Sequence, residues 1–201
     1  MLFEIMAANP IIIVCGADHS GTSMITAFLS TNGGWIGDVE EIKRPVMPAY
    51  KRFENRDFRE LCAGIIIANF TPQFTQIEDF FKTLPPETVV LKYPKAVHLL
   101  AMFQERIERE IRVVFVQRDW LANTMSGIGK LSDRKPEEAS GYMLNLISKA
   151  HLAAANFNGE LFNVSYERLC QHRSGGDLLR FCGLPSKDID YSAIKPEMKN
   201  F

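Results

Sequence analysis

The feature that most constrains the fold of this chain is the stretch of residues 11–25. Its first five residues are an apolar run, Ile-Ile-Ile-Val-Cys, which ends at Gly16. A short polar turn then leads to Gly21, and apolar residues recur with helical spacing from Met24 onward. This order predicts a buried strand, a tight turn and a helix. The first turn of a helix carries backbone N–H groups without internal partners, so it is a natural binding site for a phosphate.

The composition of the turn also favours an anion. Glycine allows the backbone to turn tightly and to approach a phosphate closely. Hydroxyl side chains add hydrogen-bond donors. The residues that carry this hypothesis are Gly16, Gly21, Thr22 and Ser23. A nucleoside-triphosphate loop has lysine at the place of Thr22, which argues against a kinase or triphosphatase. A glycine-containing turn that binds nothing is the alternative from this stretch alone.

A second stretch is expected to converge on the same anion. Residues 112–117 have the pattern of a buried strand, and Arg118 follows at its end. A strand-end arginine lies above the sheet, where open α/β proteins bind ligands. Asp119 can cap the helix that follows. Ser126 lies about two turns into that helix, so Arg118 and Ser126 can reach one ligand.

Together the two stretches resemble the sulfotransferases that use 3′-phosphoadenosine 5′-phosphosulfate (PAPS), and among them the small bacterial members. That family has a P-loop-like turn, usually Lys or Arg before Ser-Gly-Thr-Ser/Thr, and a strand-end Arg followed eight residues later by Ser. Here the segments are His19-Ser-Gly-Thr-Ser and Arg118 with Ser126. Segments 54–58, 164–169 and 181–185 are similar to further family segments, and the order fits over about residues 10–185.

The resemblance implies a sulfotransferase that moves a sulfuryl group from PAPS to a hydroxyl or amine acceptor, releases 3′,5′-adenosine bisphosphate (PAP) and needs no metal. It implies that Ser20 and the rest of the turn bind the 5′-phosphosulfate, that Arg118 and Ser126 bind the 3′-phosphate, and that Tyr166 lies near the adenine. The acceptor would be a small molecule or a carbohydrate. A non-catalytic module that binds a 3′-phosphoadenosine nucleotide is the alternative, followed by a P-loop kinase or NTPase.

The resemblance also assigns catalytic candidates. His19 stands where the family has Lys or Arg, and a neutral imidazole does not replace a fixed cation. Lys92, at the end of a predicted strand, matches a family lysine that points at the sulfuryl group. The base is expected to be Glu40, by its offset from the turn, with Glu41 and Glu54 as alternatives. We therefore expect His19, Glu40 and Lys92 to be the catalytic residues.

Composition narrows the class of protein. The chain has 201 residues, enough for one domain that spans 1–201. Its formal net charge of −1 gives no reason to expect nucleic acid as a partner. The four cysteines have no metal-ligand spacing, and we expect reduced thiols. The N-terminus does not resemble a signal peptide, and no apolar run reaches the ~20 residues of a membrane span. A cytoplasmic protein without a membrane partner is expected; the oligomeric state is not predicted.

Strands alternate with helical stretches along the chain, which predicts a three-layer α/β/α fold around a parallel sheet of about four to five strands, like that of the P-loop NTPases. The expected strands are 11–15, 88–92, 112–117 and 161–165. The expected helices are 22–30, 50–69, 74–82, 96–110, 119–130, 136–157, 166–171 and 177–182. Residues 35–48 are expected to form an irregular loop near the acceptor.

Overall fold

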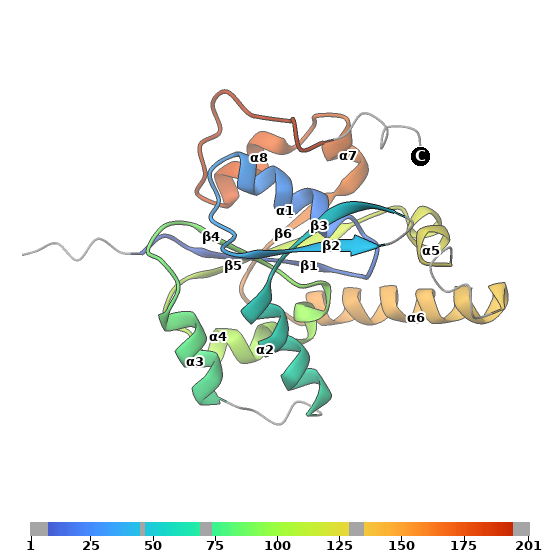
Figure 1. The fold of residues 1–201 in the computed structure, drawn as a ribbon, viewed down its shortest axis with the longest axis horizontal. Coiled ribbons are helices and arrows are strands. Elements are labelled where there is room, and N and C mark those ends of the chain that lie inside the picture. Colours follow the sequence, from blue (N-terminus) through green and yellow to red (C-terminus); the bar gives the residue numbers. More distant parts are fainter. Residues whose placement is uncertain (1–7, 45–46, 69–73, 129–134, 195–201) are drawn as a thin grey trace, which may run out of the picture.

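A parallel β-sheet forms the centre of the computed structural model, which describes residues 8–44, 47–68, 74–128 and 135–194. Within that part of the chain, the sheet has four strands in the order β4-β1-β5-β6. They are β1 (Ile11–Gly16), β4 (Val89–Lys92), β5 (Ile111–Gln117) and β6 (Glu160–Ser165). Helices cover both faces of the sheet (Figure 1). The predicted three-layer α/β/α architecture with a parallel sheet is confirmed.

The central place of β1 explains its continuous apolar sequence. Ile13 pairs with Leu91 of β4 on one side and with Val113 of β5 on the other, both in parallel register. Side chains alternate between the two faces of a strand, so each face must meet an apolar layer. Ile11, Ile13 and Cys15 belong to one core, whereas Ile12 and Val14 belong to the other.

The helices divide into two layers, as Figure 1 shows. One layer contains α1 (Thr22–Thr31), α7 (Tyr166–Cys170) and α8 (Gly175–Phe181). The opposite layer contains α2 (Arg56–Ile67), α3 (Phe74–Lys82), the 3-10 helix η1 (Pro94–Leu99), α4 (Leu100–Arg106) and α6 (Pro136–Ala155). The helix α5 (Trp120–Ile128) packs against α6. The two layers place one core on each face of the sheet.

The segment after α1 differs from the sequence-based expectation. An antiparallel pair, β2 (Val39–Arg44) and β3 (Met47–Asn55), occupies the predicted irregular loop and the first residues of the predicted helix. A two-stranded ribbon outside the main sheet tolerates proline, and Pro48 belongs to β3. The helix begins only at Arg56, because the side chain of Asn55 caps it by accepting from the Phe58 N–H at 3.0 Å.

The predicted helix 96–110 is also shorter than expected. It is replaced by η1 and α4, and α4 ends at Arg106. Beyond it, Arg109 donates from Nε to the carbonyl oxygen of Asn9 at 2.5 Å and from Nη1 to that of Pro85 at 2.6 Å. These bonds hold the chain near the end of the sheet where β1 and β4 begin. The helix therefore does not continue to residue 110.

The other helices lie within a few residues of their predicted positions. Gly175 and Gly176, which were expected to separate two helices, form the first turn of α8 instead. The end of the predicted helix 119–130 lies outside the described residues. All four cysteines are buried free thiols, and burial raises the pKa of Cys182 to about 12. No helix in the described ranges has the length and apolar character needed to cross a bilayer.

Candidate functional site

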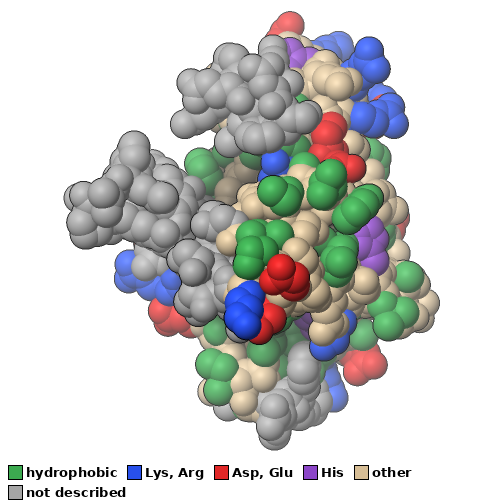
Figure 2. Space-filling view, turned by 90° about the vertical axis from the view of Figure 1, so that its right-hand side faces the viewer, with side chains coloured by type: hydrophobic (Ala, Val, Ile, Leu, Met, Phe, Trp, Pro, Cys, Tyr) green, Lys and Arg blue, Asp and Glu red, His purple; other side chains and the backbone are tan. Residues whose placement is uncertain are grey.

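A pocket of about 810 Å³ lies at the carboxyl ends of β1, β4 and β5. It gathers most of the residues that the sequence singled out: His19, Gly21, Thr22, Ser23, Lys92, Arg118, Ser126 and Tyr166. Figure 2 shows the right-hand side of Figure 1, where α5 follows β5, and acidic, basic and hydrophobic side chains lie next to one another there. The described part of this face is therefore of mixed character rather than uniformly basic.

Two glycines set the course of the loop between β1 and α1. Gly16 has φ 155°, and a Cβ there would lie 2.7 Å from the carbonyl oxygen of Val116 and 2.9 Å from Ser20 Oγ. Gly21 has φ 98° and precedes the first turn of α1, and a Cβ there would overlap the Tyr166 ring. Any other residue at these positions would strain the backbone and move a neighbour. The two glycines therefore let the loop pack closely against β5 and Tyr166.

The amino terminus of α1 has the features of an anion site. Among the described residues no side chain caps this helix, and its first turn has no acidic residue. Ser20 is 1% exposed, and its Oγ has no hydrogen-bond partner within the described residues. Buried hydroxyls are nearly always bonded, so this one is unusual. Gly16 and Ser20, which the sequence indicated as nucleotide-binding residues, do not line the pocket; Ser20 Oγ lies beside Gly16, behind the loop.

Arg118 connects the loop to the opposite wall of the pocket. Its Nη1 donates to the carbonyl oxygen of His19 at 3.2 Å. Its guanidinium lies 4.9 Å from the centre of the Tyr166 ring, in cation–π contact. Burial raises the pKa of Tyr166 to about 12, although the charge of Arg118 works in the opposite direction. The Tyr166 hydroxyl therefore keeps its proton at neutral pH and remains a hydrogen-bond donor.

Asn123 is a supporting residue that the sequence reasoning missed. It is buried in α5, and in the amide orientation that satisfies its neighbours its Nδ2 donates to the carbonyl oxygens of Asp18 at 2.9 Å and His19 at 3.1 Å. It thereby holds the turn between β1 and α1 from behind. Its place three residues before Ser126, on the same helix face, is a signal that could have indicated this role.

Glu167 is a second supporting residue. Its Oε1 accepts from the backbone N–H of Asp119 at 2.9 Å, and its Oε2 accepts from the Ser165 hydroxyl at 3.1 Å. These bonds tie the end of β6 to the segment that carries Arg118. Asp119 Oδ1 accepts from the Ala122 N–H at 2.9 Å, so the predicted cap of α5 is confirmed.

A buried ion pair lies elsewhere on the pocket wall. Lys92 Nζ donates to Glu54 Oε1 at 2.6 Å, and the two side chains are only 4% and 8% exposed. Lys92 ends β4, and Glu54 comes from β3, just before α2. Tyr93 lies beside them, half-buried; burial, with smaller contributions from Cys62 and Glu54, raises its pKa. This wall thus combines a carboxylate, an ammonium and a phenol.

Glu40 and His98 are two further candidate residues from the sequence. Glu40 belongs to β2, but its side chain lies outside the described part of the structure. His98 is an exposed residue of η1; partial burial of its ring, followed by the charges of Lys149 and Lys95, lowers its pKa. Over the described ranges, no three His, Cys, Asp or Glu residues gather as a metal site.

No protein-family model matches the chain, and no curated protein matches its sequence. Solved structures of similar fold include two sulfotransferases. The sulfotransferase domain from the Synechococcus PCC 7002 olefin synthase superposes with a TM-score of 0.59 at 16% identity, over 97% of this chain and 84% of that one. A sulfotransferase from Alicyclobacillus acidocaldarius gives 0.53 at 14% identity, over 96% and 89%. At these identities the likeness establishes the fold.

Proposed function

We propose that this protein is a sulfotransferase that binds PAPS in the 810 Å³ pocket and moves its sulfuryl group to the hydroxyl, or the amine, of an acceptor. The observation that carries the proposal is the convergence in one pocket of the amino terminus of α1, a strand-end arginine and a buried Lys92–Glu54 pair. The two sulfotransferases of similar fold support it.

In this proposal, different walls of the pocket bind different groups of the nucleotide. The loop residues Gly21, Thr22 and Ser23 and the terminus of α1 hold the 5′-phosphosulfate, because they offer N–H and hydroxyl donors where the helix dipole favours an anion. Arg118 and Ser126 hold the 3′-phosphate, a group that ADP and ATP lack. Charge-assisted bonds from a guanidinium are among the stronger contacts that a phosphate can make.

Transfer then needs a proton acceptor and a cation. The acceptor oxygen attacks sulfur, a new S–O bond forms, and the S–O bond to the 5′-phosphate breaks, with its electron pair leaving on the phosphate. We assign proton removal to Glu54, because its carboxylate lines the pocket and lies 2.6 Å from Lys92. The Lys92 ammonium stabilises the charge that develops on the sulfuryl and leaving oxygens. Glu40 remains the alternative base.

The assignment is tested with ³⁵S-labelled PAPS and a panel of hydroxyl and amine acceptors. At a temperature where this destabilised variant is still folded, Glu54→Gln should lower turnover by at least ~10²-fold, the scale of general-base catalysis, and should leave PAP affinity within about threefold. Glu105→Gln, an exposed residue of α4 away from the pocket, is the matched control and should keep normal turnover.

Three results would count against the proposal. Normal turnover in Glu54→Gln together with a ~10²-fold loss in Glu40→Gln would move the base to Glu40. Normal turnover in both variants would remove the base from this part of the chain. Tight PAP binding without transfer to any acceptor would identify a binding module rather than an enzyme.

A further inference from the structure

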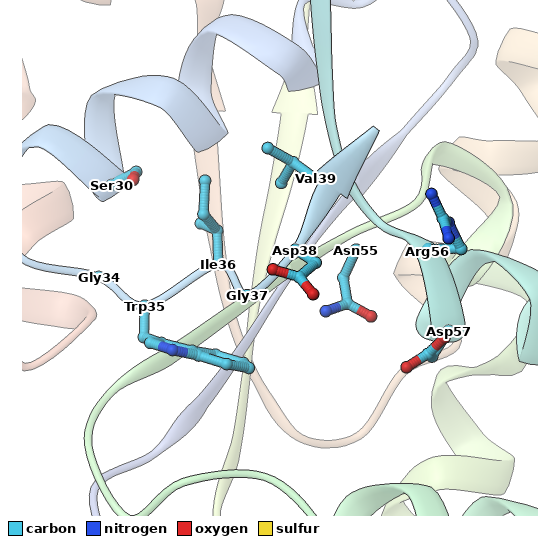
Figure 3. A pocket seen from close by; sticks show the side chains of 10 residues that line it. All are labelled: Ser30, Gly34, Trp35, Ile36, Gly37, Asp38, Val39, Asn55, Arg56 and Asp57. Atoms are coloured by element: carbon cyan, nitrogen blue, oxygen red, sulfur yellow. The ribbon is translucent and has the colours of Figure 1, made fainter. Parts of the chain in front are cut away.

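A second hollow, of about 790 Å³, lies beside the first and shares no lining residue with it among those described. It is formed by the segment that joins α1 to β2 and by the start of α2. Figure 3 shows the Trp35 ring along one side and the side chains of Asp38 and Asn55 between it and Asp57. Glu54 and Asn55 are consecutive residues, yet Glu54 lines the first pocket and Asn55 lines the second.

The Trp35 ring is a fixed wall of this hollow. The backbone of Trp35 is bonded to the edge of the sheet: its N–H donates to Thr88 O at 2.9 Å, and its carbonyl accepts from Val90 N at 2.7 Å. These bonds pair Trp35 in parallel with Val89, beside β4. Its side chain is half-buried, so part of the indole remains open to a ligand. A rigid aromatic surface of this kind binds the apolar face of a flat or ring-shaped molecule at low entropic cost.

Asn55 supplies a polar group that points into the hollow. Its side chain is 8% exposed, and its Oδ1 is occupied by the cap of α2. Asn55 lines the hollow, and Figure 3 shows its amide beside Asp38. The Nδ2 group is a hydrogen-bond donor that can bond to an acceptor of a ligand on this wall.

Gly37 allows the Trp35 ring and the Asn55 amide to lie close together. It has φ 62°, and a Cβ there would lie 2.6 Å from Asn55 Nδ2 and 2.8 Å from the Trp35 ring. These distances leave no room for a side chain at this position. The ring and the amide therefore lie next to each other on the wall of the hollow.

The other polar side chains make the hollow a mixed site. Asp38 and Asp57 are acceptors, Arg56 is a donor, and Ser30 is both. A cation would suit the two carboxylates but would leave the Asn55 donor unsatisfied and would meet the Arg56 charge. A sugar ring matches all of them, because its hydroxyls both donate and accept while its C–H face is apolar.

We propose that this hollow is a binding site for a neutral sugar ring, which stacks on Trp35 and bonds to Asn55 and Asp38. The site goes beyond the proposed transfer reaction and does not depend on it. Sugar binding is measured without nucleotide. A negative result would therefore leave the sulfotransferase proposal intact. Likewise, a failure to detect sulfuryl transfer would leave the sugar-binding proposal intact.

The chain offers a clean reporter, since it has two tryptophans, Trp35 and Trp120. Trp120 is 59% exposed on α5 and does not line the hollow, so Trp120→Phe leaves Trp35 as the single fluorophore. The probes are chitohexaose, cellohexaose and a galactose hexamer, with choline as the cationic probe. At least one hexasaccharide should change Trp35 emission saturably, and choline should not.

Two variants in the Trp120→Phe background locate the site. Asn55→Asp keeps an oxygen to cap α2 but removes the Nδ2 donor, and it should weaken binding at least tenfold without lowering the thermal midpoint. Asp38→Ala should weaken binding at least fivefold, whereas the matched change Asp79→Ala, at an exposed position of α3, should have no effect. A saturable response to choline alone, no response to any hexasaccharide, or equal affinities in all variants would overturn the proposal.

Discussion

The buried ion pair of Lys92 and Glu54 allows a prediction about the stability of the fold and of the pocket wall. We expect Lys92→Met and Glu54→Gln to be strongly destabilising when made singly and much less so when combined. Each single change leaves one charged group at 4% or 8% exposure without its partner. The double change leaves no unpaired charge at this position.

The magnitude follows from the burial and the short distance. Removing one partner of a buried ion pair costs about 3–5 kcal/mol, whereas replacing both is often close to neutral. A domain of this size has a free energy of unfolding of about 5–15 kcal/mol, so each single change removes a large part of it. Near the midpoint, 1 kcal/mol corresponds to a shift of about 2–4 °C, so each single variant should melt about 6–20 °C lower.

The assay is urea unfolding of the four proteins of the cycle, followed by circular dichroism at neutral pH. The coupling free energy between the two positions should be at least about 2 kcal/mol. Lys82→Met serves as the control, because Lys82 lies 3.8 Å from Glu78 in an exposed pair of α3 and should change stability by less than about 1 kcal/mol. Additive effects of the two buried changes would refute the account of this wall.

Two further predictions concern the loop between β1 and α1. His19→Arg tests whether His19, an expected catalytic residue, adds positive charge to that of Lys92: the change should extend sulfuryl transfer to higher pH, because an imidazole loses its charge as pH rises through neutrality whereas a guanidinium stays charged to above pH ~12; an unchanged pH–rate profile would leave Lys92 as the cation. Gly21→Ala should lower the free energy of unfolding by about 1–3 kcal/mol, because of φ 98° and the overlap with Tyr166. The same change at Gly64, an exposed position of α2 with nothing within 4 Å, should be neutral or stabilising in the same unfolding assay.

The parts of the fold that were predictable have local signals. The apolar run of β1 is continuous because the strand is central and covered on both faces. The eight-residue spacing from Arg118 to Ser126 spans a strand end and two helical turns, and both residues line the pocket. Each of these patterns reflects the geometry of one element and its ends.

The parts that were missed depend on contacts between distant segments. Lys92 and Glu54 are 38 residues apart, and nothing local indicates that they pair. The strand that brings Glu54 to the pocket was predicted as helix, because the apolar spacing around Phe53 and Phe58 also suits a helix. The loop contacts of Asn123 exist only after α5 has packed behind the turn. Contacts between distant segments leave no periodic pattern of residues in the sequence, so they could not be predicted from it.

The central claim is that this pocket recognises a 3′-phosphorylated adenosine nucleotide, and isothermal titration calorimetry with PAP, ADP and Mg-ATP tests it most directly. We expect PAP to bind at least ~30-fold more tightly than ADP, since loss of a charge-assisted phosphate contact costs about 2 kcal/mol or more. Arg118→Ala should abolish that preference and leave ADP affinity nearly unchanged, whereas Arg180→Ala, exposed on α8, should preserve it. Equal affinity for PAP and ADP in the unmodified protein, or a preference for Mg-ATP, would contradict the claim.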